Sequence, residues 1–509
     1  MKFSIATIKS YTVIFGIAAI VYITTAYNSL GYYQADEHYQ IVEFAGSKLR
    51  STPPYALAWE YTAMIRPALQ PTICAGILKG LSSLTITDPY SQSFVLRLVT
   101  AILALLIIHL FISQTERQFE NKQIKIAYYL LSYLLWFIPV ISVRFSSETW
   151  SGLTFLLALA IFLNPKHEST KPYILGIILG FSFLFRFQAA LLIVGFGLWM
   201  LMVNRTKFTF ITKMIFAFIV VIAMGFLVDS WFYGQWVFTP WNYFYTTVLK
   251  VGAPDFGSSP WYYYLEKLIQ FPSVFIGILL FIAFAVLVIR TPKNIYLWCI
   301  VPFIVAHSII PHKEERFLFP IIYLFPVIMI SAYAWCIGII KRNKVIAIFK
   351  FIVVFLFVMV NSIGIVAMSQ KAAGIGRMAI TKYIHDNYKG HAMNLIYCNW
   401  SNPYDPWYGL PVRFYLDGKM STHHIGDLCQ LNDSLLQPNA DNILIIRKQD
   451  LDYNDCKKAI ETNHFVFKIQ SIPAWEEWLN KRYKGFDNNS ILVLYHREVG
   501  KSMASPNIN

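Results

Sequence analysis

Long apolar runs alternate with short polar connections along the chain up to residue 368. An apolar helix needs about 20 residues to cross the hydrocarbon core of a bilayer. The first run is interpreted as a span rather than a cleaved signal, because no small-residue cleavage pattern follows it. The runs cover residues 11–29, 92–113, 126–143, 150–163, 173–185, 188–203, 214–228, 271–289, 295–310, 318–340 and 345–368. The pattern predicts an α-helical polytopic membrane domain over residues 1–368, with about eleven transmembrane helices.

The pattern changes after residue 368. Short runs with β-type alternation lie at 394–398, 443–447, 464–472 and 491–495, and polar or helical stretches separate them. These runs predict a small C-terminal α/β domain over residues 369–509.

Composition indicates an integral membrane protein, and the distribution of charge predicts which loops face the cytoplasm. Only 14% of the residues are charged, whereas soluble proteins carry about 25%. Basic residues concentrate in alternate connections, which the positive-inside rule assigns to the cytoplasm. This distribution accounts for the net charge of +15 without a nucleic-acid partner. The five connections are 114–125, 164–172, 204–213, 290–294 and 341–344. The loops 30–91, 229–270 and 311–317 and the tail are therefore expected on the non-cytoplasmic face.

Metal and nucleotide motifs are absent from the sequence. The six cysteines show no metal-ligand spacing, although one bridge among Cys398, Cys429 and Cys456 is compatible with the sequence. No Walker loop, complete dinucleotide fingerprint or HExxH is found. We therefore expect no metal site and no cofactor, and a nucleotide-driven pump is disfavoured.

The first outer loop begins with carboxylates at the membrane boundary. Asp36 and Glu37 follow the first span, and Glu43 lies further along. Glycosyl transfer needs a base for the acceptor hydroxyl, and a carboxylate at this depth suits a donor whose lipid tail stays in the bilayer. A solvated acidic loop start is the alternative interpretation.

Aromatic and charged residues also gather in the outer loops. Trp59, Glu60 and Arg66 lie in the first loop, and Asp229 and Trp261 lie in the loop 229–270. Such groups suit sugar stacking or a lipid groove, but they are equally typical of an interfacial belt.

The connection 311–317 holds five consecutive ionisable residues between two spans. They are His312, Lys313, Glu314, Glu315 and Arg316. Charge at this position needs partners, and Lys with Arg suits a phosphate. An ordinary charged turn is the alternative. Arg144 and Arg186 also lie at outer span ends and are further candidates for phosphate.

Together these stretches resemble the glycosyltransferase family 22 mannosyltransferases, which include enzymes of GPI-anchor and lipid-linked-oligosaccharide assembly. Residues 312–317 read HKEERF and match the family motif HKExRF, Asp36 and Glu37 match its acidic pair, and 229–236 fit D-x-x-[FY]-Y-G-x-[WL]. Segments at 36–43, 59–66, 257–261, 398–403 and 411–414 look most like the GPI-anchor branch. His38 and the stretch 257–259 depart from that branch, which leaves the acceptor open.

The resemblance implies an inverting GT-C enzyme. Its donor would be a polyprenyl-phosphate mannose (dolichyl in eukaryotes) and its acceptor a glycan or glycolipid. Asp36 would be the base, supported by Glu37. The donor phosphate would be bound by His312, Lys313 and Arg316. The acceptor or sugar would contact Glu43, Trp59, Glu60, Arg66, Asp229, Trp261, Glu314 and Glu315.

The resemblance also implies a location, and other functions stay open. The protein would lie in the ER membrane of a eukaryote or the inner membrane of a bacterium, with a luminal or periplasmic active site. Another GT-C glycosyltransferase with a different lipid-phosphate sugar is the main alternative. A secondary transporter would leave the large outer tail unexplained, and a non-catalytic scaffold subunit would not need Asp36.

Overall fold

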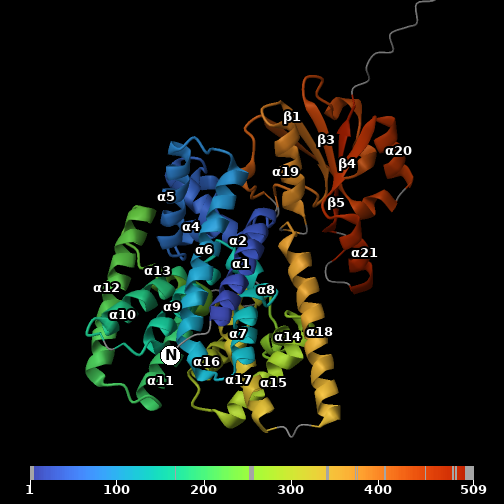
Figure 1. The fold of residues 1–509 in the computed structure, drawn as a ribbon. Coiled ribbons are helices and arrows are strands. Elements are labelled where there is room, and N and C mark those ends of the chain that lie inside the picture. Colours follow the sequence, from blue (N-terminus) through green and yellow to red (C-terminus); the bar gives the residue numbers. More distant parts are fainter. Residues whose placement is uncertain are drawn as a thin grey trace, which may run out of the picture. The chain divides into compact units, whose positions relative to one another are not determined.

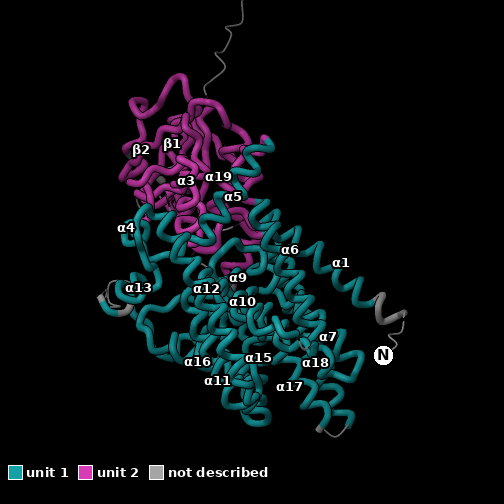
Figure 2. Tube along the Cα trace, turned by 90° about the vertical axis from the view of Figure 1, so that its left-hand side faces the viewer, with its two compact units in different colours: residues 1–28, 59–84, 94–370 teal, residues 29–58, 85–93, 371–509 magenta. Residues whose placement is uncertain are grey.

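The computed structural model divides the chain into two compact units (Figure 2). We call residues 1–28, 59–84 and 94–370 the membrane unit, and residues 29–58, 85–93 and 371–509 the tail unit. Two segments of the predicted first outer loop thus group with the tail. The structure describes residues 5–166, 168–250, 257–339, 343–372, 374, 376–405, 409–452, 454–483, 487 and 490–498.

Some predictions fall on residues outside this description. Lys341 and Arg342 of the last predicted cytoplasmic loop are among them, as are the side chains of Cys429 and Cys456. Cys398 is buried and is not part of a disulfide bridge. A disulfide bridge that joins Cys398 to either of the other two is therefore not formed, and the remaining pairing stays a prediction.

The membrane unit is built from helices, and each predicted apolar run coincides with a helix or with two consecutive helices. The longer ones are α1 (Ile5–Asn28), α5 (Leu69–Ser83), α6 (Pro89–Thr115), α7 (Lys122–Leu134), α9 (Ser147–Leu163), α10 (Lys171–Phe185), α11 (Ala190–Met202), α12 (Phe208–Tyr233), α15 (Val274–Arg290), α16 (Ile295–Ile309), α17 (Phe325–Ile339) and α18 (Lys344–Ser369) (Figure 1). The shorter ones are α4 (Trp59–Ala63), α8 (Phe137–Ser142), α13 (Thr239–Phe244), α14 (Tyr263–Gln270) and the 3₁₀ helix η7 (Glu315–Leu324).

Several of these helices meet the requirements for crossing a bilayer. Among the described residues, five helical segments are long and apolar enough, and a sixth results if α15 and α16, bent by 117°, count as one span. The helices Ser147–Leu163, Lys171–Phe185 and Phe187–Met202 are apolar but shorter. The prediction of a polytopic helical membrane protein is confirmed, and the predicted number of about eleven includes these shorter helices.

Glycines permit the close packing of α9, α10 and α12 in the membrane unit. A Cβ atom at Gly176 of α10 would lie 2.1 Å from the backbone oxygen of Met214 on α12. A Cβ atom at Gly152 of α9 would lie 2.7 Å from the Cα atom of Pro320 in η7. Small residues at such crossings let helix backbones approach closely in membranes, where dispersion contacts replace the hydrophobic effect. This packing fixes the position of η7, which begins at Glu315 within the charged connection 311–317.

The tail unit contains a five-stranded sheet with the order β2-β1-β3-β5-β4. Strand β1 pairs in parallel with β2 and β3, while β5 pairs antiparallel with β3 and β4. The strands are β1 (Met393–Cys398), β2 (Met420–Ile425), β3 (Asp441–Arg447), β4 (Phe465–Gln470) and β5 (Leu492–Arg497). The helices are α2 (Ala35–Glu37), the π-helix η1 (His38–Glu43), α3 (Phe44–Leu49), α19 (Arg377–Tyr388), α20 (Asn454–Thr462) and α21 (Ala474–Tyr483).

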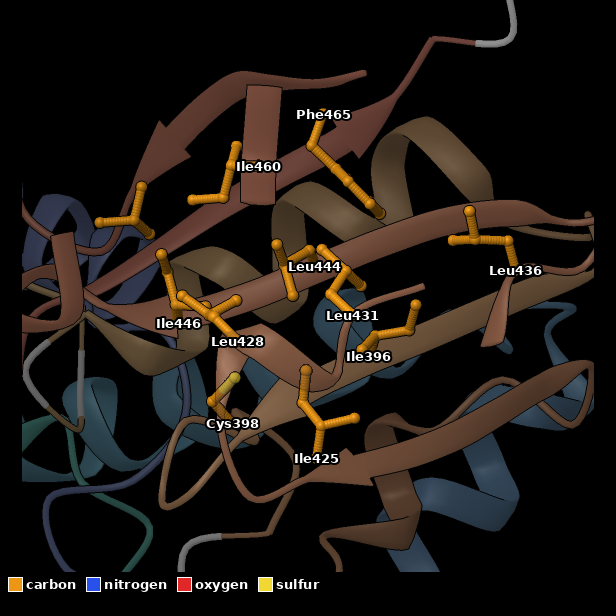
Figure 3. Packing of buried hydrophobic residues seen from close by; sticks show 11 residues of the cluster. Ile396, Cys398, Ile425, Leu428, Leu431, Leu436, Leu444, Ile446, Ile460 and Phe465 are labelled. Atoms are coloured by element: carbon orange, nitrogen blue, oxygen red, sulfur yellow. The ribbon is translucent and has the colours of Figure 1, made fainter. Parts of the chain in front are cut away.

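An apolar core explains which strands the sequence reveals. Leu444 and Ile446 of β3 and Ile396 of β1 are buried in one cluster (Figure 3). Val493 of β5 belongs to the same cluster. The predicted small α/β domain is therefore present, and its four apolar runs became strands. Strand β2 was missed because its sequence, Met-Ser-Thr-His-His-Ile, is polar. An edge strand needs only one partner and little burial.

The glycine packing makes a testable prediction. Gly176→Ala should destabilise the membrane unit, because the added methyl group collides with the backbone of α12, and such overpacking costs about 1–3 kcal/mol. Gly197→Ala in α11 is the matched control, since nothing lies within 4 Å of its Cβ position. Thermal unfolding in detergent should show a lower midpoint for Gly176→Ala only. Equal midpoints for the two variants would contradict this packing.

Candidate functional site

Glu314 organises the charged stretch in the membrane unit. Arg316 donates from Nε to Glu314 Oε2 at 2.7 Å and from Nη2 to Oε1 at 2.8 Å, a bidentate pair. His312 Nε2 lies 3.1 Å from Glu314 Oε1. Burial alone would raise the pKa of Glu314, but the hydrogen bonds from His312 and Arg316 and the charge of Arg316 lower it to about 2. Glu314 is therefore ionised and holds the side chains of His312 and Arg316 in place.

The Lys313 side chain bonds to backbone oxygens rather than to the Glu314 carboxylate. Its ammonium donates to the backbone oxygen of Ser259 at 2.9 Å and to that of Pro311 at 3.4 Å. The amide of Ser259 also donates to Pro311 O at 3.0 Å, which ties the loop 257–261 to the charged stretch. Lys313 is 7% exposed, and burial lowers the pKa of its ammonium. Within the described part of the chain, no carboxylate forms an ion pair with it.

Glu315 and Trp261 occupy more open positions. The Glu315 carboxylate pairs with Lys267 of α14 at 2.7 Å rather than with the arginine of its own motif. Trp261 is 68% exposed and meets the ring of Tyr262 edge-on. The two side chains, both predicted to contact the acceptor, are accessible at the surface of the membrane unit.

A second arginine–glutamate pair lies beside Arg316. Arg186, directly after α10, places Nη1 3.0 Å from Glu148 Oε1. The same Glu148 oxygen lies 3.8 Å from Arg316 Nε. The sequence pointed to Arg186 only as a basic residue at a span end, and Glu148 was missed. A carboxylate in the first turn of an apolar helix was the available signal, because buried charge in such a helix needs a partner.

The first loop contributes a third pair. Arg66 Nη2 lies 3.6 Å from Glu60 Oε1, and its guanidinium is 5.7 Å from the ring centre of Tyr243. Tyr233 donates to the backbone oxygen of Arg66 at 2.8 Å. Trp59 begins α4 in the same loop and is 47% exposed. Tyr233 at the end of α12 and Tyr243 within α13 position Arg66 through these contacts.

Asp229 anchors this loop. Its Oδ1 accepts from the amide of Ala68 at 2.7 Å, and its Oδ2 accepts from Thr239 Oγ1 at 2.5 Å. Asp229 is 2% exposed. The side chain predicted to contact acceptor therefore connects α12 to the starts of α5 and α13. This geometry indicates a positioning role for the 229–236 motif.

The predicted base and its neighbour belong to the tail unit. Asp36 and Glu37 form the single turn α2 and are half-buried. The Glu37 carboxylate accepts from the amide of Tyr33. The cation-rich stretch 312–316 belongs to the membrane unit, so the two groups are described separately.

Glu43 is a structural link within the tail unit. Its Oε1 lies 3.0 Å from His38 Nε2 and accepts from the amide of Phe414 at 3.0 Å, and its Oε2 accepts from Thr52 at 2.6 Å. The π-helix η1 brings positions five apart together, which explains the contact with His38. Burial raises the pKa of Glu43, but these hydrogen bonds outweigh it and the net shift is downward. The residue predicted to contact acceptor thus joins the first loop to 411–414.

No metal-binding group is found in the described ranges, where no three His, Cys, Asp or Glu side chains gather closely enough to hold an ion. The described charged groups around the stretch 312–316 and the loop 59–68 include three arginine–glutamate pairs, the Lys267–Glu315 pair and the Lys313 ammonium bound to backbone oxygens. Such an arrangement is suited to binding an anion, and phosphate in particular, through directed N–H groups.

Comparisons with known proteins agree on one family. The sequence profile described as the Alg9-like mannosyltransferase family matches residues 12–417. GPI alpha-1,2-mannosyltransferase 3 of Xenopus laevis is 25% identical over 58% of this chain and 54% of its own length. GPI mannosyltransferase 3 of Yarrowia lipolytica is 26% identical over 61% of this chain and 60% of its own length. The chain thus spans about half the length of the curated relatives it matches.

A solved structure shares the fold. The crystal structure of ArnT from Cupriavidus metallidurans bound to undecaprenyl phosphate aligns with a TM-score of 0.51 at 11% identity, over 96% of this chain and 98% of ArnT. The predicted GT-C type of membrane fold is confirmed by this likeness.

The anchoring by Asp229 generates a prediction. Asp229→Asn offers one acceptor oxygen in place of two, so either Ala68 N–H or Thr239 O–H loses its partner, at about 1–3 kcal/mol. We expect a lower unfolding midpoint and faster amide exchange in residues 59–68. Asp386→Asn, which removes only an exposed ion pair with Lys382, is the matched control. If amide exchange in residues 59–68 were as slow in Asp229→Asn as in the wild type, the anchoring role would be ruled out.

Proposed function

Because the chain belongs to the Alg9-like mannosyltransferase family, we propose that it transfers mannose from polyprenyl-phosphate mannose to a glycan or glycolipid acceptor. The reaction takes place on the non-cytoplasmic face of the membrane, as in GPI-anchor or lipid-linked glycan assembly. The names of the GPI mannosyltransferase relatives support the sugar and the acceptor class. The distribution of basic residues in the loops supports the side of the membrane.

Lys313 is the observation that carries the proposal. A buried ammonium is unfavourable unless an anion neutralises it, and backbone oxygens supply only partial charge. The structure provides no carboxylate for Lys313 among the residues it describes, although Glu148 and Glu314 serve neighbouring arginines. The phosphodiester of the donor supplies the missing negative charge. His312 and Arg316, held by Glu314, complete the phosphate site.

The transfer is a single displacement. The acceptor oxygen forms a bond to C1 of mannose while the bond from C1 to the phosphate oxygen breaks, and the electron pair leaves with polyprenyl phosphate. Asp36 takes the acceptor proton, and Glu37 supports Asp36 or binds the acceptor. Inversion at C1 turns a β-linked donor into an α-mannoside. Fixed cations at the leaving phosphate provide electrostatic stabilisation that needs no reorganisation during the reaction.

We propose that the acceptor contacts residues of the loops 59–66 and 257–261 and of the charged stretch. Trp59 and Trp261 present exposed rings on which sugars stack, and Glu60 and Arg66 offer charged groups for their hydroxyls. Glu315 beside Lys267 can extend this surface. We propose that the reaction uses no metal and no cofactor besides the lipid-phosphate sugar.

Asp36 is tested by sugar transfer with purified protein in detergent. The assay offers radiolabelled polyprenyl-phosphate mannose and a panel of lipid-linked and GPI-type acceptors. Asp36→Asn should lower kcat by about 10²–10⁴-fold, because the proton acceptor is lost, with donor affinity retained. Asp386→Asn should behave like wild type. Near-normal turnover by Asp36→Asn would remove Asp36 from the mechanism. Transfer of glucose, galactose or arabinose in place of mannose would identify another lipid-phosphate glycosyltransferase.

Lys313 is tested by donor binding. Lys313→Met keeps the length of the side chain and removes its charge, so we expect polyprenyl-phosphate mannose to bind about 10–100-fold more weakly. Lys267→Met, which removes a lysine already paired with Glu315, is the control. The unfolding midpoint should not fall, because the substitution removes an uncompensated buried charge. Unchanged donor affinity would show that the phosphate binds elsewhere.

A further inference from the structure

Arg186 lies outside every sequence motif of the site, yet it is part of the same charged cluster. Besides its ion pair with Glu148, its Nη1 donates to Ser147 Oγ at 3.1 Å. Its guanidinium lies 5.3 Å from the ring centre of Phe317, and that of Arg316 lies 5.8 Å from the same ring. Two guanidinium groups thus share one aromatic ring and the Glu148 carboxylate, and Arg316 pairs with Glu314 as well.

The proximity of the two guanidinium groups is itself unfavourable, and Glu148 and Glu314 together supply one carboxylate for each arginine. Arg186 and Arg316 are 6% and 5% exposed, so solvent screens their repulsion poorly. Burial lowers the pKa of Arg186, Glu148 opposes that shift, and the charges of Arg316 and Arg66 lower it further. A cation at the end of α10 is favoured by the helix dipole, but that effect requires only one arginine and does not account for the second guanidinium beside it.

The chemistry of transfer supplies a further anion, and this step rests on the proposed function. The donor is a phosphodiester with a single negative charge, whereas the leaving group is a phosphate monoester with a charge near −2 at pH 7. Lys313 alone balances the resting donor. As the bond from C1 to oxygen breaks, additional negative charge develops on the phosphate.

We propose that Arg186 binds the donor phosphate together with Arg316 and stabilises the charge that develops on the leaving group. Glu148 is a positioning residue, since it contacts both guanidinium groups and sets their orientation around Phe317. Arg186 therefore acts more strongly on kcat and on the affinity for polyprenyl phosphate than on the KM for the donor.

The test compares Arg186→Gln, Arg186→Lys and the double variant Arg186→Gln/Glu148→Gln in full-length purified protein. The double variant replaces the buried pair by two neutral side chains, so it should fold even if Arg186→Gln alone leaves Glu148 uncompensated. Arg290→Gln is the control. Arg290 is the last residue of α15, and its guanidinium stacks on the ring of Trp335. The probes are polyprenyl phosphate alone, for affinity, and polyprenyl-phosphate mannose with acceptor, for kcat and KM.

We expect kcat to fall about 10²–10³-fold in Arg186→Gln and in the double variant. Polyprenyl phosphate should bind at least about tenfold more weakly, the KM for the donor should change less, and Arg186→Lys should restore part of both losses. Recovery of kcat and product affinity in the double variant would overturn the proposal, because it would show a purely structural ion pair.

The two proposals fail differently. Affinity for polyprenyl phosphate involves no sugar. If wild type transfers no mannose but loses this affinity in Arg186→Gln, the proposed function is wrong and the phosphate role of Arg186 stands. If wild type transfers mannose and Arg186→Gln binds polyprenyl phosphate normally, the function stands and the role of Arg186 is wrong.

Discussion

The cost of burying charge governs the architecture of the membrane unit. An ion removed from water is tolerated only where opposite charge or directed hydrogen bonds replace its hydration. The three arginines near Phe317 and Tyr243 each have a carboxylate, as the pairs Arg66–Glu60, Arg186–Glu148 and Arg316–Glu314. Lys313 has backbone oxygens instead, and among described residues no carboxylate compensates it. This local excess of positive charge is the physical basis for assigning a phosphate ligand.

Several motif residues hold the structure through hydrogen bonds of their own. Asp229 connects three helices through two hydrogen bonds, and Glu43 joins the first loop to Phe414 within the tail unit. Glu314 uses both carboxylate oxygens on its neighbours His312 and Arg316. A motif therefore marks the residues needed to build a site. The hydrogen bonds and ion pairs that each residue makes within the protein determine whether its polar atoms remain available for sugar or phosphate.

The pattern of apolar residues along the sequence predicted most of the fold. The apolar runs found the membrane helices because a bilayer demands about 20 apolar residues per crossing, a strong local signal. Strand β2 was not predicted, because a polar edge strand has no such signal. The close packing at Gly176 was not predicted either, because it depends on the facing helix. The contact of Glu148 with Arg186 could not be predicted for the same reason. Pairing across helices is a tertiary property, and Glu148 stands 38 positions before its partner in the chain.

A structure of the wild-type protein with bound polyprenyl-phosphate mannose would test whether Lys313 binds the donor phosphate. We predict the donor phosphate within hydrogen-bonding distance of Lys313 Nζ, with the guanidinium groups of Arg316 and Arg186 directed at its oxygens. A donor whose phosphate lies away from Lys313, with that ammonium still bound only to Ser259 and Pro311, would contradict this assignment.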